Sequence, residues 1–257
     1  MTAGARPLTG VRVAVTRPLD SAAALEELLR SAGAVPVTVP LTRVLPPEND
    51  ASLRRAVMDI DRIDWIVFTS VRAVRAVADV RGWQGARPRI AAVGPATAAA
   101  VRGLTGADPD IVPRRKSASD IVPAMLDIAP LQDATVLWPR AEEPRPELRR
   151  ALDRAGARVE DPVAYRTVAD PVAGARLAGI AADGGVDVIT FTAPSAVDCF
   201  ADACHRPIRC VIGVIGPVTA SAARGQGLPV HVEAEQPMIS ALVGALARHH
   251  DRGSAQL

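Results

Sequence analysis

Arginine, hydroxyl and glycine-proline residues recur directly after short apolar stretches of this 257-residue chain, where they could bind an anionic ligand. Arg17 and Arg140 follow two of these stretches, and Thr69 and Ser70 follow a third. The planar guanidinium fork suits carboxylate and phosphate groups. Hydroxyls and backbone N–H groups at the start of a helix bind the same anions without a side-chain base. These residue types therefore indicate a site for carboxylates or phosphates.

The candidate binding residues share one predicted place, the carboxyl end of a parallel strand, where such sheets bind ligands. They are Arg17, Thr69, Ser70, Gly94, Arg140, Thr192, Pro194, Ser195, Gly216, Pro217 and Thr219. Taken one at a time, Gly-Pro before a helix is often only turn chemistry, and Ser or Thr there is often only a helix cap. Because the pattern occurs in both halves of the chain, we expect a two-lobed cleft.

Tyr165 is the only tyrosine of the chain, and Arg166 follows it. A phenol can donate a proton and can stack on a ligand, which suits a residue that faces a cleft. The alternative is a tyrosine that covers apolar surface, and the residues alone leave both readings open. Ser195 has no evident histidine base, so a serine nucleophile is not predicted.

Cofactor, metal and nucleic-acid sites lack their usual signatures. No G-x-G-x-x-G follows the first predicted strand, and Lys116 lies outside any glycine-rich loop, so neither a dinucleotide nor a phosphate loop is expected. Cys199, Cys204 and Cys210 fit neither a disulfide framework nor paired zinc ligands, and we expect reduced thiols. The sequence has no basic run with interleaved aromatic residues, so nucleic-acid binding is not predicted. The sequence predicts no cofactor and no metal.

The elements that must position these residues form an internal repeat. Arg17 and Arg140 lie 123 positions apart, and so do Gly33 and Gly156. The same spacing relates Phe68-Thr69-Ser70 to Phe191-Thr192-Ala193, and after one deletion Gly94-Pro95-Ala96-Thr97 aligns with Gly216-Pro217-Val218-Thr219. Matching blocks in the same order indicate that one structural unit occurs twice in the chain.

Within each half, β-branched runs alternate with Ala-, Leu- and Arg-rich stretches of helical period, which is typical of βα units. We predict strands over residues 11–15, 35–39, 64–68, 89–93, 110–112, 135–138, 158–168, 187–191, 210–215 and 229–232. Helices fill the gaps, and Gly33 and Gly156 lie where two of them end in a left-handed residue. The predicted fold class is α/β, with two flavodoxin-like, doubly wound parallel-sheet domains.

Two segments at equivalent places in the repeat do not look like ordinary short loops. Residues 36–47 contain four prolines, and residues 158–171 are an extended polar-apolar stretch. If they pair, they would form a two-stranded hinge that joins the domains.

Composition predicts a folded protein that spans no membrane. The chain is 49% hydrophobic and 23% charged with a formal net charge of +2, which disfavours disorder and leaves room for two domains. No apolar run approaches the ~18 residues that a membrane helix needs. The N-terminal residues lack the apolar stretch of a signal peptide, so we expect a cytoplasmic protein.

In this order, the motifs resemble the uroporphyrinogen-III synthase family over about residues 11–248. They include Val15-Thr16-Arg17-Pro18, Phe68-Thr69-Ser70, Ala164-Tyr165-Arg166-Thr167-Val168, Thr192-Ala193-Pro194-Ser195 and Ile215-Gly216-Pro217-Val218-Thr219-Ala220. The resemblance implies a cofactor-free hydro-lyase that closes linear hydroxymethylbilane to uroporphyrinogen III, with loss of water and inversion of the fourth pyrrole ring. The substrate, a linear tetrapyrrole with eight carboxylates, would lie between two flavodoxin-like lobes.

The resemblance also implies domain boundaries and residue roles. The first βα unit would join the C-terminal part, giving domains 1–38 plus 167–257 and 43–163, with linkers 39–42 and 164–166. Tyr165 matches the family tyrosine proposed to assist departure of the hydroxyl, Thr219 the threonine of the Gly-Pro-x-Thr loop, and Arg17 the early arginine. Departures put single contacts in doubt: Ala193 stands where serine is frequent, Ala141 where glycine is common, and Ala23 or Ala24 where glutamine often occurs.

Two other functions stay open at this point. The chain could be a two-lobed ligand-binding or regulatory module that kept the fold and lost the reaction, although Tyr165 and Thr219 disfavour this. A sugar-phosphate or nucleotide-phosphate enzyme on a flavodoxin-like scaffold would need a glycine-rich phosphate loop, which the sequence lacks. We expect a monomer, because the repeat already supplies the partner surface within one chain.

Overall fold

The computed structural model describes residues 6–81, 83, 88–113, 120–144 and 146–254. The chain divides into two compact units. Unit 1 comprises Met1–Arg43 and Val168–Leu257, and unit 2 comprises Val44–Thr167. Among the helices of the described residues, none combines the length and the hydropathy that a membrane span requires.

Unit 1 is built on a five-stranded parallel sheet in the order β12-β11-β10-β1-β2. Its strands are β1 (Arg12–Val15), β2 (Val35–Thr38), β10 (Val188–Phe191), β11 (Val211–Val214) and β12 (Val232–Glu233). The central strand β10 is buried along its whole length, as expected for a parallel strand covered on both faces. In chain order within the unit this is the flavodoxin-like arrangement 2-1-3-4-5.

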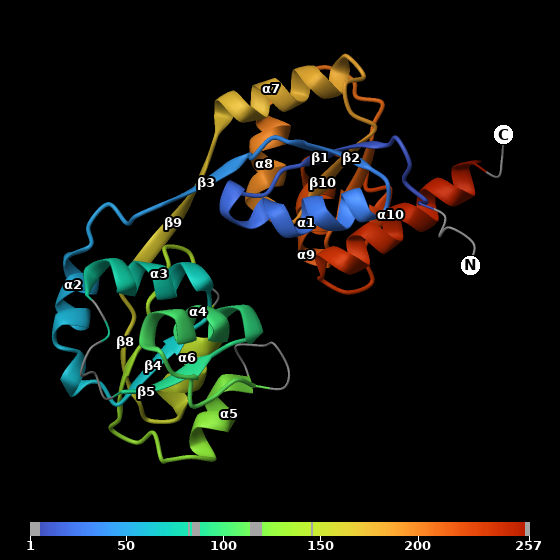
Figure 1. Cartoon of the computed structure of the whole chain (residues 1–257). Coiled ribbons are helices and arrows are strands. Elements are labelled where there is room, and N and C mark those ends of the chain that lie inside the picture. Colours follow the sequence, from blue (N-terminus) through green and yellow to red (C-terminus); the bar gives the residue numbers. More distant parts are fainter. Residues whose placement is uncertain (1–5, 82, 84–87, 114–119, 145, 255–257) are drawn as a thin grey trace, which may run out of the picture. The chain divides into compact units, whose positions relative to one another are not determined.

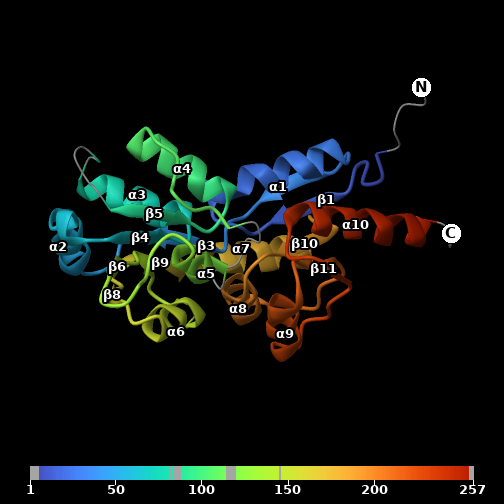
Figure 2. The same cartoon turned by 90° about the horizontal axis from the view of Figure 1, so that it is seen from below.

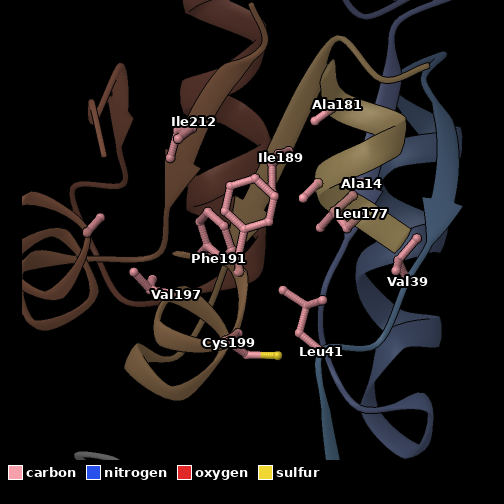
Figure 3. Packing of buried hydrophobic residues seen from close by; sticks show 14 of the residues in the cluster. Ala14, Val39, Leu41, Leu177, Ala181, Ile189, Phe191, Val197, Cys199 and Ile212 are labelled. Atoms are coloured by element: carbon pink, nitrogen blue, oxygen red, sulfur yellow. The ribbon is translucent and has the colours of Figure 1, made fainter. Parts of the chain in front are cut away.

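Helices cover both faces of the unit 1 sheet (Figure 1). On one face lie α1 (Leu19–Ser31) and α10 (Ile239–Ser254), and on the other lie α7 (Pro171–Ala182), α8 (Pro194–Ala203) and α9 (Pro217–Gly225). Figure 3 shows the core beneath the second group, where Phe191, Leu177 and Ile189 point toward one another. The Phe191 ring lies 5.6 Å from that of Phe200, centroid to centroid. Apolar burial of this kind is the main stabilising term of the unit.

Unit 2 repeats this plan (Figure 2). Its strands are β4 (Trp65–Phe68), β5 (Arg89–Ala92), β6 (Thr135–Leu137) and β8 (Arg158–Glu160), in the parallel order β5-β4-β6-β8. One face is covered by α2 (Ala51–Met58), α3 (Val71–Val80) and α4 (Pro95–Thr105), with the 3-10 turn η1 (Ile60–Arg62) after α2, and the other face by α5 (Ile121–Leu126) and α6 (Glu147–Arg154). Position for position, β8-β6-β4-β5 corresponds to β2-β1-β10-β11. The predicted α/β class with two parallel-sheet domains from an internal repeat is confirmed.

A third sheet joins β3 (Thr42–Leu45), β9 (Val163–Ala169) and β7 (Arg140–Ala141), in the order β3-β9-β7. The chain passes from one unit to the other in β3 and in β9. The predicted two-stranded hinge is therefore part of a three-stranded sheet, because β7 adds to β9 in parallel. The predicted domain boundaries and linkers stay a prediction.

Three predicted strands differ from the observed ones. The stretch 158–168 is two strands of different sheets, β8 and β9, interrupted at Asp161 and Pro162, and proline has no N–H to offer a ladder. Residues 110–112 form only a single bridge, between Ile111 and Ala91. The strand predicted over 229–232 begins only at Val232.

Two glycines end helices as predicted. Gly33, with φ +92°, follows α1, and Gly156, with φ +78°, follows α6. A Cβ on Gly33 would lie 2.9 Å from the Thr9 hydroxyl, and one on Gly156 would lie 2.2 Å from the Gln132 side chain. The left-handed conformation favours glycine at both equivalent positions, and at Gly33 the close approach of Arg6 and Thr9 adds to this.

Candidate functional site

In unit 1, three of the sequence-predicted segments meet at the carboxyl edge of the sheet. Arg17 follows β1, Thr192 follows β10 and Gly216 follows β11. These strands are neighbours in the sheet, and strand neighbours lie about 4.8 Å apart. The order of the strands reverses between β1 and β10, which makes this edge the place where a doubly wound sheet binds ligands.

Helices α8 and α9 start at this edge with no side chain capping them. Ala193 and Gly216 are their N-cap residues, Pro194 and Pro217 take the first helical position, and neither helix has a side-chain cap hydrogen bond. Proline tolerates that position because its missing N–H would have no partner inside the helix. The remaining N–H groups of both first turns, together with the helix dipoles, favour an anion here.

Two candidate hydroxyls of these helices differ in exposure. Ser195 is exposed in the first turn of α8, whereas Thr219 is only 3% exposed in the first turn of α9. Thr192, between β10 and α8, is half-buried. Ser195 and Thr192 can therefore reach a ligand by their hydroxyls, and Thr219 lies beneath the surface of the edge.

Two buried threonines tie the ends of β1 and β10 together. The Thr16 hydroxyl donates to the carbonyl of Thr190 at 2.7 Å, and the Thr190 hydroxyl donates to the carbonyl of Ala14 at 2.7 Å. Both threonines are 0% exposed. Buried hydrogen bonds of this kind fix the strand ends from which Arg17 and Thr192 extend.

In unit 2, the corresponding edge gathers Thr69, Ser70 and Trp138. The Trp138 indole Nε1 lies 3.4 Å from the Thr69 hydroxyl, which joins the ends of β6 and β4. Ser70 is the N-cap of α3, and its hydroxyl accepts the N–H of Ala73 at 3.1 Å. Gly94 is the N-cap of α4 and has no side-chain cap, like Gly216 in unit 1. The structure thus brings Thr69 and Ser70 to one edge, while Ser70 also has a capping role.

Tyr165 lies on β9 within unit 2, half-buried and packed against the apolar cluster of α2, α3 and α4. The guanidinium carbon of Arg72 lies 5.9 Å from the centre of its ring, in cation–π range. Its carbonyl accepts the N–H of Glu142 at 3.0 Å. The tyrosine covers apolar surface and also keeps part of its side chain exposed, so the two readings of the sequence are compatible.

Arg140 lies on β7, and much of its hydrogen-bonding capacity is used within the protein. Its Nε donates to Asp161 at 2.9 Å, and its Nη1 donates to the carbonyls of Ala141 and Glu142 at 2.9 and 3.0 Å. The side chain is 20% exposed. Whether it also binds a substrate stays a prediction.

Sequence reasoning missed Arg72 and Asp161. Nothing in the sequence sets them apart from the other basic and acidic residues, because Arg72 meets Tyr165 of β9, and Asp161 meets Arg140 and Arg149, only in the folded unit. The one available signal was the position of Arg72 two residues after Ser70, in the first turn of a predicted helix.

Two hollows of unit 2 have none of the candidate residues in their lining. One, of about 410 Å³, is lined by Ser52, Arg55, Ala56, Arg62, Glu160, Asp161 and Pro162. The other, of about 570 Å³, lies at the amino ends of β4, β5 and β6 and includes Trp65, Arg89 and Asp133.

In the part of the chain that the structure describes, no three His, Cys, Asp or Glu residues gather as metal ligands would. Cys199, Cys204 and Cys210 are free thiols, and burial raises the pKa of Cys210 to about 11.

Comparison with known proteins identifies relatives over most of the chain. The family model described as uroporphyrinogen-III synthase HemD matches residues 23–244. A protein of Methanothermobacter thermautotrophicus with a provisional uroporphyrinogen-III synthase name is 30% identical, and the alignment covers 91% of this chain and 97% of that protein. The uroporphyrinogen-III synthase of Synechococcus elongatus is also 30% identical, over 63% of this chain and 62% of its own length.

Two solved structures share the fold. A mutant uroporphyrinogen III synthase from Thermus thermophilus aligns with a TM-score of 0.62 at 22% identity, over 95% of this chain and 100% of its own. The uroporphyrinogen-III synthetase of Helicobacter pylori aligns with a TM-score of 0.62 at 16% identity, over 93% of this chain and 99% of its own. The repeat, the two parallel sheets and the family match agree, and the chain belongs to the uroporphyrinogen-III synthase family of enzymes.

Proposed function

We propose that this chain converts the linear tetrapyrrole hydroxymethylbilane to uroporphyrinogen III, with loss of water and inversion of the fourth pyrrole ring. Family membership supports the proposal. The observation that carries it is that each unit presents uncapped helix starts at the carboxyl edge of its sheet: α8 and α9 in unit 1, and α4 in unit 2. A substrate with eight carboxylates requires many such anion-binding groups.

Each unit would bind part of the substrate's carboxylates. In unit 1 the proposed binding residues are Arg17, Thr192, Pro194, Ser195, Gly216, Pro217 and Thr219, and in unit 2 they are Thr69, Ser70 and Gly94. The prolines and glycines would contribute through backbone placement, because they start helices whose first-turn N–H groups have no side-chain cap. The buried Thr219 would act mainly by holding the first turn of α9.

Tyr165 is the proposed catalytic residue. When the hydroxyl leaves the substrate, the C–O bond breaks and the departing oxygen needs a proton to leave as water. A phenol remains protonated at neutral pH and can supply a hydrogen bond or a proton at that oxygen. The half-buried position of Tyr165 is compatible with this contact.

Holding the substrate is the larger task, because the same substrate can also close without inverting its fourth ring. The enzyme must keep the reacting ends in the geometry that leads to inversion. Backbone N–H groups suit this purpose because they are fixed by the helices and lose little freedom on binding. We further propose that the chain acts as a cytoplasmic monomer without a cofactor, with neither nucleic acid nor membrane as a partner.

The test is the product formed from freshly prepared hydroxymethylbilane. We expect isomer III in excess of isomer I, at a rate proportional to the protein concentration, when the products are oxidised and separated by chromatography. Isomer I alone, formed at the spontaneous rate, would contradict the proposal and favour a ligand-binding module of the same fold.

Replacing the phenol hydroxyl tests the role of Tyr165. Tyr165→Phe keeps the ring that packs against the apolar cluster and the stack with Arg72. We expect the rate of isomer III formation to fall about 10- to 100-fold without being abolished, because general acid catalysis is only part of the rate enhancement. Undiminished turnover in this variant, at wild-type thermal stability, would remove Tyr165 from the mechanism.

A further inference from the structure

We propose that Asp161 is a positioning residue for Tyr165, and that it acts through Arg140, whose main role is then to hold β7 against β9. The inference rests on the proposed function, since it takes Tyr165 as the catalytic group. All the residues involved lie in unit 2. It assigns Arg140 a different main role from the substrate contact that the sequence suggested.

Asp161 stands between two arginines. Its Oδ2 accepts from Nε of Arg140 at 2.9 Å, and its Oδ1 accepts from Nη1 of Arg149 at 2.9 Å. Arg149 comes from α6 and also bonds Asp153 one turn along that helix. The Arg140 and Asp161 side chains are 20% and 28% exposed. A charge-assisted bond in such a half-buried place orients its donor better than a fully exposed ion pair would.

Arg140, held in this way, fastens its own strand. Its Nη1 donates to the carbonyls of Ala141 and Glu142, at 2.9 and 3.0 Å. One guanidinium therefore joins the Asp161 carboxylate, in the link between β8 and β9, to two successive carbonyls of the chain at the end of β7. The planar fork suits such a multiple contact, and lysine could not reproduce it.

The strand held by this clamp borders Tyr165 directly. Ala141 is paired with Tyr165 in the β7–β9 ladder, and the N–H of Glu142 donates to the Tyr165 carbonyl at 3.0 Å. At the other end, the N–H of Arg140 donates to the carbonyl of Pro162 at 3.1 Å. These are the backbone bonds that fix β9 on the β7 side.

Strand β7 needs outside support because it is short and irregular. It has two residues, Arg140 and Ala141, and its register against β9 shifts between them. Such a short ladder is weak by itself. Without the clamp from Asp161, we expect β7 to loosen and the backbone at Tyr165 to lose its fixed position, and a displacement of about 1 Å can cost on the order of a hundredfold in rate.

The test compares Asp161→Asn with Glu160→Gln. The second variant breaks the neighbouring Arg62–Glu160 ion pair, which ties η1 to β8 and has no bond to β7. We expect Asp161→Asn to lower kcat for isomer III formation about tenfold with KM within twofold of wild type. Glu160→Gln should leave both constants unchanged. Loss of amide protection at Glu142 in Asp161→Asn, measured by hydrogen exchange, would accompany the fall in kcat.

A double-mutant cycle with Tyr165→Phe separates positioning from general loss of structure. If Asp161 acts by positioning the phenol, Asp161→Asn should have little further effect in the Tyr165→Phe background. An undiminished tenfold loss in that background would overturn the proposal. So would a rise in KM with unchanged kcat, because this would make Arg140 a substrate-binding residue that Asp161 merely orients.

Two further outcomes are distinguishable. If Asp161→Asn does not fold, Arg149→Gln is the second variant. It removes the ion pair between Arg149 of α6 and Asp161 and leaves the pair between Arg140 and Asp161, so it should lower kcat by a smaller factor with KM unchanged. An unchanged kcat in that variant would overturn the clamp. If Tyr165→Phe alone turns over at the wild-type rate, the proposed function of Tyr165 fails, whatever the result at Asp161.

Discussion

Helices α3 and α8 occupy the same place in the two units, yet their first turns are satisfied in different ways. Ser70 begins α3 and accepts the N–H of Ala73 with its own hydroxyl, whereas Ala193 begins α8 and offers no such group. The two residues are counterparts in the repeat. One helix start has a side-chain cap, and the other has none.

This difference shows that the repeat does not fix how a helix start is satisfied, because the counterpart positions hold a serine in one copy and an alanine in the other. A side-chain cap stabilises a helix, but it uses an N–H group that an anion would otherwise bind. Ala193 provides no such cap for α8, and Gly216 provides none for α9 at the same edge. In unit 1 the starts of α8 and α9 lack a side-chain cap, as does that of α1 after β1, and in unit 2 the start of α4 at Gly94 lacks one.

The largest effect that we predict tests whether the cores of the two units are equivalent. Phe68 and Phe191 are counterparts, both 0% exposed. Each change to alanine should lower the free energy of unfolding by about 3–5 kcal/mol, because a large cavity is left in a packed core. Urea denaturation of both variants, followed by circular dichroism, measures this. A loss below about 1 kcal/mol in one of them would show that its core is loosely packed.

Exchanging the caps tests this difference between the two helix starts directly. Ala193→Ser should stabilise the protein by about 0.5–2 kcal/mol, because it gives α8 the cap that Ser70 gives α3. Ser70→Ala is the matched control, and it should destabilise the protein by a similar amount. A free energy of unfolding that Ala193→Ser leaves unchanged would show that the first turn of α8 does not accept the cap that α3 has.

The smallest predicted effect concerns the opposite, amino edges of the sheets. In unit 2 the Asp110 carboxylate accepts the N–H of Ile90 at 2.7 Å, and in unit 1 Nδ1 of His231 accepts the N–H of Ile212 at 2.9 Å. Only a neutral imidazole can accept in this way. Burial, and then the nearby His249, lower the pKa of His231.

The sign of the resulting pH dependence follows from that shift. Below the ordinary histidine pKa of about 6.5, the unfolded chain takes up a proton that the folded chain resists, so stability falls as the pH drops toward the folded pKa. His231→Asn, which keeps an acceptor that does not titrate, should flatten this part of the stability profile. Thermal melting between about pH 5 and 7.5 measures it. An unaltered profile would place the sensitivity elsewhere.

Much of the fold could be predicted from the sequence, because the repeat and the β-branched runs both follow local chemistry. The strand ends at Arg17, Thr192 and Gly216, and the glycine helix ends at Gly33 and Gly156, lie where their residue types indicate. Strand β7 was missed because two residues carry no periodicity. The break between β8 and β9 was missed although Pro162 was a signal for it.

The candidate site was only partly predictable. Residue types identify the helix starts, but they do not show whether a hydroxyl is used as a cap, as at Ser70, or stays available, as at Ser195. Residue type also predicted Arg140 as a ligand for anions, but it does not show that Asp161 already accepts a hydrogen bond from its Nε. Such competition between partners depends on distances that only the folded chain sets.

The central claim is that the carboxyl edges of both sheets bind the carboxylates of the tetrapyrrole. Amide NMR of labelled protein, titrated with uroporphyrinogen III under anaerobic conditions, tests it most directly. We predict shifts concentrated at the starts of α4, α8 and α9, including Ala96, Ser195 and Thr219, with little change at Ile90 and Ile212. Shifts confined to the amino edges, or to one unit alone, would contradict the account.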